Sequence, residues 1–164
     1  LLASSAASDV YKRQILLLSE ILILKQIDMN RSEFSTKLVK LKNKAQVRLK
    51  DSLPYALQLN KNKVDALEKG TFDYVMENVF LYLKMCGTSM EIKGRDVTYS
   101  TDNIDGLRKA IVAIRMSAGL SIRDLAKQSS TYISVLEAFE DGRCDLRIDT
   151  FLKLADTLEM KIEI

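Results

Sequence analysis

Basic side chains are concentrated between Arg31 and Gly70, where ten basic residues face four acidic ones and leave a net charge of +6. The later stretch from Gly106 to Gly142 holds five basic and four acidic residues, a net charge of only +1. Clustered lysines and arginines can neutralise phosphates, so the first stretch is a candidate footprint for nucleic acid. The alternative is a lysine-rich helix face that is simply solvated. The basic residues of the first stretch are Arg31, Lys37, Lys40, Lys42, Lys44, Arg48, Lys50, Lys61, Lys63 and Lys69.

Side chains that carry enzyme or metal chemistry are scarce. The 164 residues include no His, which removes the commonest general base and the usual zinc ligand. Cys86 and Cys144 stand 58 positions apart, so the sequence excludes a zinc cluster and suits a reducing, cytoplasmic environment. We find no nucleophile–base pair, phosphate-cradling loop or acid dyad. The sequence therefore predicts neither an enzyme nor a bound cofactor or metal.

Two stretches share one pattern, Leu53 to Gly70 and Leu125 to Gly142, at a constant interval of 72 residues. In each, apolar residues three positions apart are followed at once by Glu and then, two positions later, by Gly. Apolar residues at that spacing lie on one helix face, and a closing Gly supplies the left-handed residue that ends a helix. We expect the repeated acids, Glu68 and Glu140, to be caps or ion-pair partners rather than catalysts. The pattern predicts an internal repeat.

The repeated motif, Leu-x(10)-apolar-x(2)-apolar-Glu-x-Gly, resembles the helix-turn-helix core of lambda-repressor-like (Cro/XRE-type) DNA-binding domains. The second copy resembles that family over residues 104–164, and the first copy over residues 31–92. The resemblance implies an all-α fold of two tandem five-helix units, with a small pair of β-strands contributed by the ends of the repeats. We place the first unit at 29–92, a linker or hairpin at 93–102 and the second unit at 103–164. Residues 1–14 look like a non-native leader, and residues 15–28 are expected to form an extra helix.

The same resemblance implies which side chains meet DNA, because the family reads bases from the first turn of its third helix. In the first copy that turn holds Lys61, Asn62 and Lys63 after a predicted helix cap at Asn60, with Lys50 and Arg48 on the preceding segment. Asn can pair with adenine and Lys with guanine or phosphate. In the second copy the corresponding positions are Tyr132, Ile133, Ser134 and Val135, with Ile122 before them. Ile and Val cannot read hydrogen-bond patterns and at best touch thymine methyl groups, so this copy is expected to contribute little base readout. Arg115, Arg123 and Lys127 are its candidate phosphate contacts.

The predicted function is that of a cytoplasmic, sequence-specific regulator that binds double-stranded DNA, most simply a repressor. The alternative is a protein-interaction module or antitoxin-like protein whose second unit binds a partner through Tyr132, Ile133 and Val135, since exposed apolar patches mark interfaces. Those apolar residues could equally be buried within the chain. Further dimerisation is left open by the sequence.

Local signals predict several element boundaries. Asn30 followed by Glu33 has the form of a capping box, and Asn60 suits a helix cap. Pro54 is acceptable only in a first helical turn, which predicts a short or late second helix in the first unit. Because an unpaired edge strand is a liability, we expect the segments Met90–Ile92 and Lys161–Ile164 to pair with each other.

Overall fold

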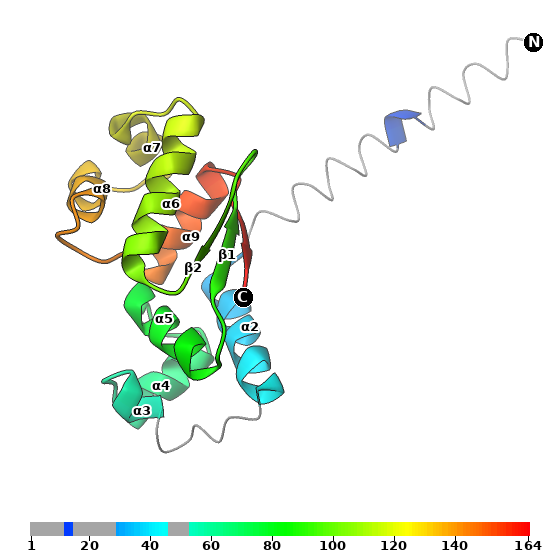
Figure 1. Ribbon diagram of the computed structural model, residues 1–164, viewed down its shortest axis with the longest axis vertical. Helices are drawn as coiled ribbons and strands as arrows, with labels where there is room; N and C mark the ends of the chain where they lie inside the picture. The colour runs from blue at the N-terminus through cyan, green and yellow to red at the C-terminus, as the bar shows by residue number, and fades with distance from the viewer. Residues whose placement is uncertain (1–11, 15–28, 46–52) are drawn as a thin grey trace, which may run out of the picture.

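The computed structural model describes residues 12–14, 29–45 and 53–164, as Figure 1 shows. The described chain is mostly helical and carries a small three-stranded antiparallel sheet, so the expectation of a helical fold with a minor β addition is confirmed at that level. The expected leader falls outside the described residues except for 12–14, and the expected helix at 15–28 falls outside them entirely. None of the described helices has the length and apolar character needed to cross a bilayer.

The first group of helices begins with α2 (Arg31–Lys44), which starts at the predicted capping box. The Asn30 side chain accepts from the Glu33 N–H at 3.0 Å, and the Glu33 carboxylate accepts from the Asn30 N–H at 3.3 Å. Next comes α3 (Leu53–Ala56), only four residues long, with Pro54 in its first turn as predicted. It is followed by α4 (Lys61–Glu68) and α5 (Met76–Met85).

The second group consists of α6 (Ile104–Ser117), α7 (Ile122–Gln128), α8 (Ile133–Glu140) and α9 (Ile148–Thr157). Here the second helix is seven residues long and has a complete capping box between Ser121 and Asp124. Buried residues from both groups, such as Phe34, Leu38 and Leu67 in the first and Leu107, Phe139 and Phe151 in the second, belong to one continuous apolar cluster.

The sheet contains β1 (Met90–Lys93), β2 (Thr98–Thr101) and β3 (Lys161–Glu163) in the order β2-β1-β3. The predicted pairing of the two strand segments is confirmed, since Ile92 lies opposite Ile162 in an antiparallel register. Strand β2 lies within the predicted linker at 93–102 and adds the third strand, whereas β1 lies mainly at the end of the predicted first unit. Met90, Ile92 and Ile162 are buried, whereas Glu91, Lys161 and Glu163 alternate with them and are exposed.

Several helix bounds and backbone features of the two groups stand 72 residues apart. Both ends of α8 lie 72 residues after those of α4, and both ends of α9 lie 72 residues after those of α5. Gln58 and Ser130, also 72 apart, both have the rare left-handed backbone conformation with φ of 52° and 51°. For α2 and α6, the interval is 73 at both ends, which leaves one more residue between the first and third helices of the earlier group than in the later group.

The two groups meet in a short antiparallel bridge between Val75 and Arg147, again 72 residues apart. The Met76 N–H donates to the Leu146 carbonyl, and the Ile148 N–H donates to the Tyr74 carbonyl, each at 2.8 Å. Figure 1 shows the same junction as the contact between α5 and the start of α9.

Helix caps are exchanged across this junction. Neither Val75 nor Arg147, the N-cap residues of α5 and α9, supplies a side-chain cap. Instead, Asp145 accepts from the Glu77 N–H at 2.8 Å, and Asp73 accepts from the Asp149 N–H at 3.4 Å. Each group therefore stabilises the first turn of the other group's last helix, where unpaired N–H groups would otherwise remain.

Candidate nucleic-acid interface

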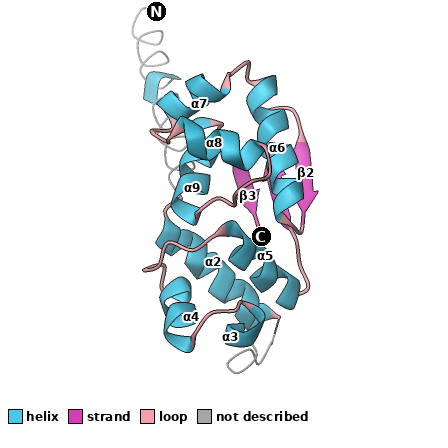
Figure 2. Ribbon diagram, turned by 90° about the vertical axis from the view of Figure 1, so that its left-hand side faces the viewer, coloured by secondary structure: helices cyan, strands magenta, loops and turns pink. Residues whose placement is uncertain are grey.

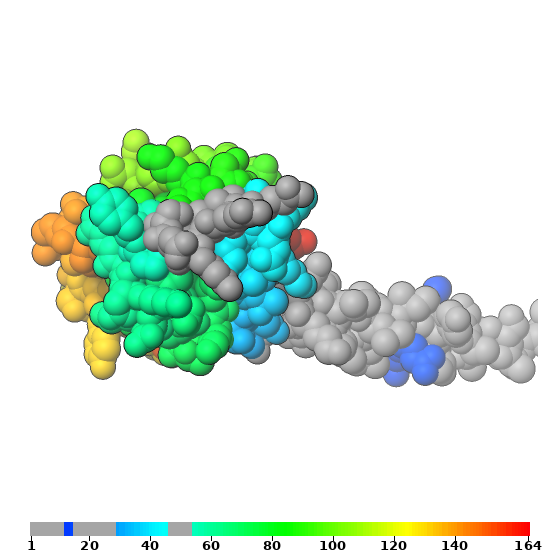
Figure 3. All heavy atoms as spheres, turned by 90° about the horizontal axis from the view of Figure 1, so that it is seen from below, coloured from blue at the N-terminus to red at the C-terminus, as the bar shows by residue number. Residues whose placement is uncertain are grey.

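The helices α4 and α8 lie on the same face of the molecule. Figure 2 looks onto this face, with the loops that enter α5 and α9 running between the two helices and the sheet behind them. Figure 3, seen from below, shows the α3–α4 region and the α7–α8 region projecting toward the same left-hand side. A single large ligand bound to this face could therefore contact both helices.

The first turn of α4 presents an exposed polar group of side chains. Asn60 caps the helix by accepting from the Lys63 N–H at 2.9 Å, which confirms the predicted cap. Lys61, Asn62 and Lys63 follow it and are all exposed. The Asn60 oxygen is engaged in the cap, whereas the exposed Asn62 side chain makes no hydrogen bond within the described residues. The Lys63 ammonium lies 5.8 Å from the centre of the Phe72 ring, a cation–π distance that restricts its position.

Two other predicted contact residues, Arg48 and Lys50, lie outside the described residues. On the neighbouring helix α2, Lys40 and Lys44 are exposed and add positive charge to the first group of helices. Lys42 differs from them, because it forms an ion pair with Glu68.

The corresponding turn of α8 has a different surface. Tyr132 is 81% exposed and provides no cap hydrogen bond, while Ser134 is exposed beside it. Ile133 and Val135 are half-buried and pack against the apolar cluster of the chain, as does Ile122 at the start of α7. Of the three residues predicted as a partner surface, only Tyr132 is thus fully displayed.

Among the predicted phosphate contacts of the second group, Arg123 and Lys127 are exposed on α7. Arg115 is not available in the same way. Its guanidinium forms a bidentate pair with Glu140, with both N···O distances at 2.7 Å, and also donates to the Leu120 carbonyl at 2.8 Å. The two side chains are only 11% and 12% exposed, so Arg115 holds α6 to the end of α8 instead of facing phosphate.

The repeated glutamates therefore have the structural role that the sequence predicted. Glu68 accepts from the Tyr82 hydroxyl at 3.0 Å as well as from Lys42, and it joins α2, α4 and α5. Burial and this neighbouring carboxylate raise the pKa of the Tyr82 hydroxyl, which keeps it neutral and able to donate. Glu140 joins α6 and α8 in a similar way, through its ion pair with Arg115.

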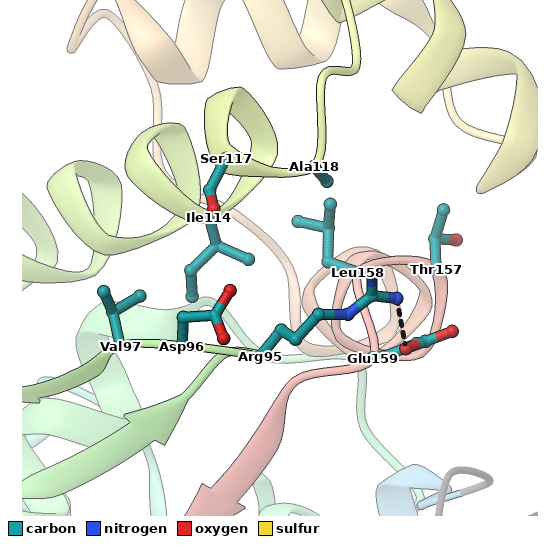
Figure 4. Close-up of a pocket in the computed structure, with 9 residues that line it drawn as sticks. All are labelled: Arg95, Asp96, Val97, Ile114, Ser117, Ala118, Thr157, Leu158 and Glu159. Carbon is teal, nitrogen blue, oxygen red and sulfur yellow. Dashed lines mark hydrogen bonds and ion pairs between the residues drawn. The ribbon is translucent and has the colours of Figure 1, made fainter.

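A cavity of about 210 Å³ lies beside the sheet, between the β1–β2 turn and the C-terminal ends of α6 and α9. Figure 4 shows Ile114 and Leu158 among its lining residues and Arg95 extended toward Glu159, with which it forms an exposed ion pair at 3.3 Å. No buried side-chain nitrogen or oxygen in the described part of the chain lacks a hydrogen-bond partner. The cavity thus offers no unsatisfied polar group that would require a ligand.

Three features of the junction between the two groups of helices were not identified from the sequence. Arg147 is exposed at the junction, and Asp73 and Asp145 provide the exchanged caps. The two aspartates stand 72 residues apart, so the repeat interval was a usable signal for them. For Arg147 there was no such signal, because its counterpart is Val75.

No protein-family model, curated protein or solved structure matches this chain.

Proposed function

We propose that the protein is a sequence-specific regulator that binds double-stranded DNA by placing the first turn of α4 in the major groove. The observation that carries this proposal is the exposed and capped turn that bears Lys61, Asn62 and Lys63. An α-helix fits the major groove, and amide and ammonium side chains at its start can pair with the edges of adenine and guanine.

We further propose that the chain is a covalent pseudo-dimer of two lambda-repressor-like units. The fixed interval between equivalent helices supports this arrangement. So do the two antiparallel pairs Val75–Arg147 and Glu91–Glu163, in which each residue lies opposite the one 72 positions later. Such pairs are expected on a twofold axis that relates two units, here called the pseudo-twofold axis. Two third helices on one face could then enter successive major grooves, about 34 Å apart.

The two units would not contribute equally. In α8 the positions of Lys61 and Lys63 are taken by Ile133 and Val135, which are half-buried and can at most touch thymine methyl groups. Arg123 and Lys127 remain exposed for phosphate. The operator is accordingly expected to combine one strongly read half-site with one weakly read half-site.

The test begins with selection of bound duplexes from a random pool, followed by titrations at several salt concentrations. Replacing both Lys61 and Lys63 with Ala should weaken binding and lower the slope of log K against log salt by about 1.8, since each phosphate contact contributes about 0.9. The matched control replaces Arg95 and Lys161 with Ala, which removes the same charge from the hairpin and sheet. If no duplex is enriched, or if both double variants change the slope equally, the proposal is wrong.

A second candidate function is binding of a protein partner by the second unit. Tyr132 and Met116 are 81% and 66% exposed, and Met116 borders a shallow, mainly apolar groove on α6 with Val112 and Ala113. Replacing Tyr132 and Met116 with Ser should then reduce capture of a protein encoded beside this one while leaving DNA binding intact. An unchanged capture would remove this candidate.

A further inference from the structure

A groove lies where α2, α9 and β3 come together. Its first part is a cavity of about 190 Å³, and Figure 1 shows β3 ending beside α2 in this region. An adjoining hollow of about 280 Å³ shares Met29 and Leu152 with the cavity and is bordered by Asp149 and Asp156 of α9. The groove is therefore elongated, and its walls come from both groups of helices.

The floor of the cavity is apolar. Ala155, Met160 and Ile162 are buried, and the half-buried Met29 and Leu152 complete the apolar lining. Ligand sites generally measure about 300–1,000 Å³ and combine an apolar lining with a few polar groups that orient the ligand. The cavity alone is below that range, so it suits the narrow apolar part of a small molecule, and the adjoining hollow gives room for a longer chain.

Positive charge is concentrated at the β3 end of the groove. Lys37 of α2 and Lys161 of β3 line the cavity, are exposed and form no ion pair within the described residues. Glu163 is the one acid among the described lining residues, and its carboxylate lies 2.8 Å from the Lys93 ammonium. The hydrogen bond from Lys93, together with the charges of Lys161 and Lys37, keeps the pKa of the Glu163 carboxyl below its ordinary value. Three ammonium groups thus oppose one carboxylate and leave an excess of positive charge beside the apolar floor.

We infer that this groove binds a small carboxylate with an apolar chain, whose charged end lies at Lys37 and Lys161 and whose chain covers the apolar floor. The two free ammonium groups favour an anion, and the apolar floor favours a hydrocarbon body over a fully hydrated ion. Because both lysines are exposed, each contributes modestly, and most of the affinity comes from burial of the chain.

The two ends of the site belong to different parts of the chain. Lys37 lies in the first group of helices, whereas Lys161 follows the last helix of the second group. A ligand that contacts both groups favours the arrangement in which they are docked. The site does not depend on DNA binding and adds a second kind of ligand to the proposed function.

The experiment uses the full chain with isotope-labelled methionine methyl groups, and octanoate is the probe. Octanoate should shift the NMR signals of Met29 and Met160, which line the cavity, and leave that of Met116 on α6 unchanged. Octan-1-ol has a chain of the same length without the charge, and octylammonium reverses the charge, so both should bind at least about threefold more weakly. Hexanoate should bind more than about tenfold more weakly than octanoate, since each buried methylene changes affinity about fourfold.

Variants at the charged end separate an anion site from a merely apolar groove. Lys37→Gln and Lys161→Gln each remove one charge and should weaken octanoate binding about threefold, the size expected for an exposed ion pair, without altering octan-1-ol binding. Lys84→Gln, at an exposed position of α5 outside the groove, is the matched control and should bind both probes as the wild-type protein does. Glu163→Gln should strengthen octanoate binding, because it removes the carboxylate that opposes the lysines.

Leu152→Gln should weaken the binding of octanoate and octan-1-ol alike, and urea unfolding without ligand checks that each variant is folded. The inference is overturned if octanoate shifts neither Met29 nor Met160, or if it shifts Met116 equally. It is also overturned if the two lysine variants bind octanoate as tightly as Lys84→Gln does, or if octan-1-ol binds as tightly as octanoate. None of these results involves a duplex, so failure here leaves the proposed function standing.

Discussion

The helices α4 and α8 have the same length and the same kind of C-terminal end, but their first turns have very different surfaces. Both helices contain eight residues, begin 72 positions apart and end in a left-handed Gly, at φ of 68° for Gly70 and 75° for Gly142. Their inner positions are filled by buried apolar residues and by a glutamate that is tied to the first helix of its group. The first-turn positions of α4 hold exposed Lys61, Asn62 and Lys63, whereas those of α8 hold half-buried Ile133 and Val135 on either side of exposed Ser134. The similar inner residues hold both helices in place, and the first-turn side chains give the two helices different surfaces.

The largest difference between the two groups should appear when their equivalent glutamates are removed. Glu140→Ala leaves the nearly buried Arg115 without its bidentate partner and should lower the free energy of unfolding by about 3 kcal/mol. Glu68→Ala should cost less, about 2 kcal/mol, because the flexible Lys42 side chain can turn to water. Urea unfolding measures both values. Glu137→Ala, at an exposed position of α8, is the control and should stay within about 0.5 kcal/mol of the wild-type protein. Equal losses at Glu68 and Glu140 would contradict this ranking.

A smaller effect should separate the two helix caps. Asn60→Ala removes the hydrogen bond to the Lys63 N–H and should cost about 1 kcal/mol, whereas Tyr132→Asn adds a cap to α8 and should gain up to about 1 kcal/mol. Tyr132→Ala removes the ring without adding a cap and shows how much of the change belongs to the ring. Thermal and urea unfolding are both suitable. If Tyr132→Asn destabilised the protein, the exposed ring would have a structural role that its surroundings do not indicate.

The smallest effect concerns the pH dependence of stability at the exchanged caps. Burial raises the pKa of the Asp145 carboxyl above its ordinary value of 3.8, although the two N–H groups that it accepts from oppose this shift. A carboxyl with a raised pKa binds more protons in the folded state, so its contribution favours folding as the pH falls through the window just above 3.8. Asp145→Asn should remove that contribution, so the variant should lose more stability than the wild-type protein as the pH falls through this window, where the carboxyls with lowered pKa, such as Asp124 and Glu163, begin to lose theirs. Urea unfolding at several pH values measures the difference between the two proteins, and a difference that stays constant with pH would point away from Asp145.

Much of the fold followed from short-range signals in the sequence. The caps at Asn30 and Asn60, the short helix at Pro54 and the pairing of β1 with β3 were all predictable, because each depends on neighbouring residues or on a matched pair of strand segments. The structural role of the repeated glutamates followed from their position in the motif. The contacts proposed for DNA remain predictions, and those of Arg48 and Lys50 concern residues outside the described chain.

Other features depend on how the two groups of helices meet, which helical periodicity does not specify. Alignment of the two motif copies showed that Ile133 and Val135 stand where α4 has lysines. It could not show how far neighbouring helices cover these two side chains. Arg115 has the charge of a phosphate contact, and only the position of α8 commits it to Glu140. The exchange of caps between Asp73 and Asp145 likewise appears only when the two groups are docked.

The order of the sheet has a consequence for how the chain folds during synthesis. Strand β1 can pair with β2 as soon as the hairpin leaves the ribosome, but its other edge is completed by β3, whose first residue comes 68 positions after Lys93. Closing so long a loop costs more conformational entropy than closing the hairpin, and contacts of this range slow folding. Until then the open edge of a nascent chain can accept a strand from a neighbouring copy, so rapid completion of the C-terminal segment protects the protein from intermolecular strand exchange.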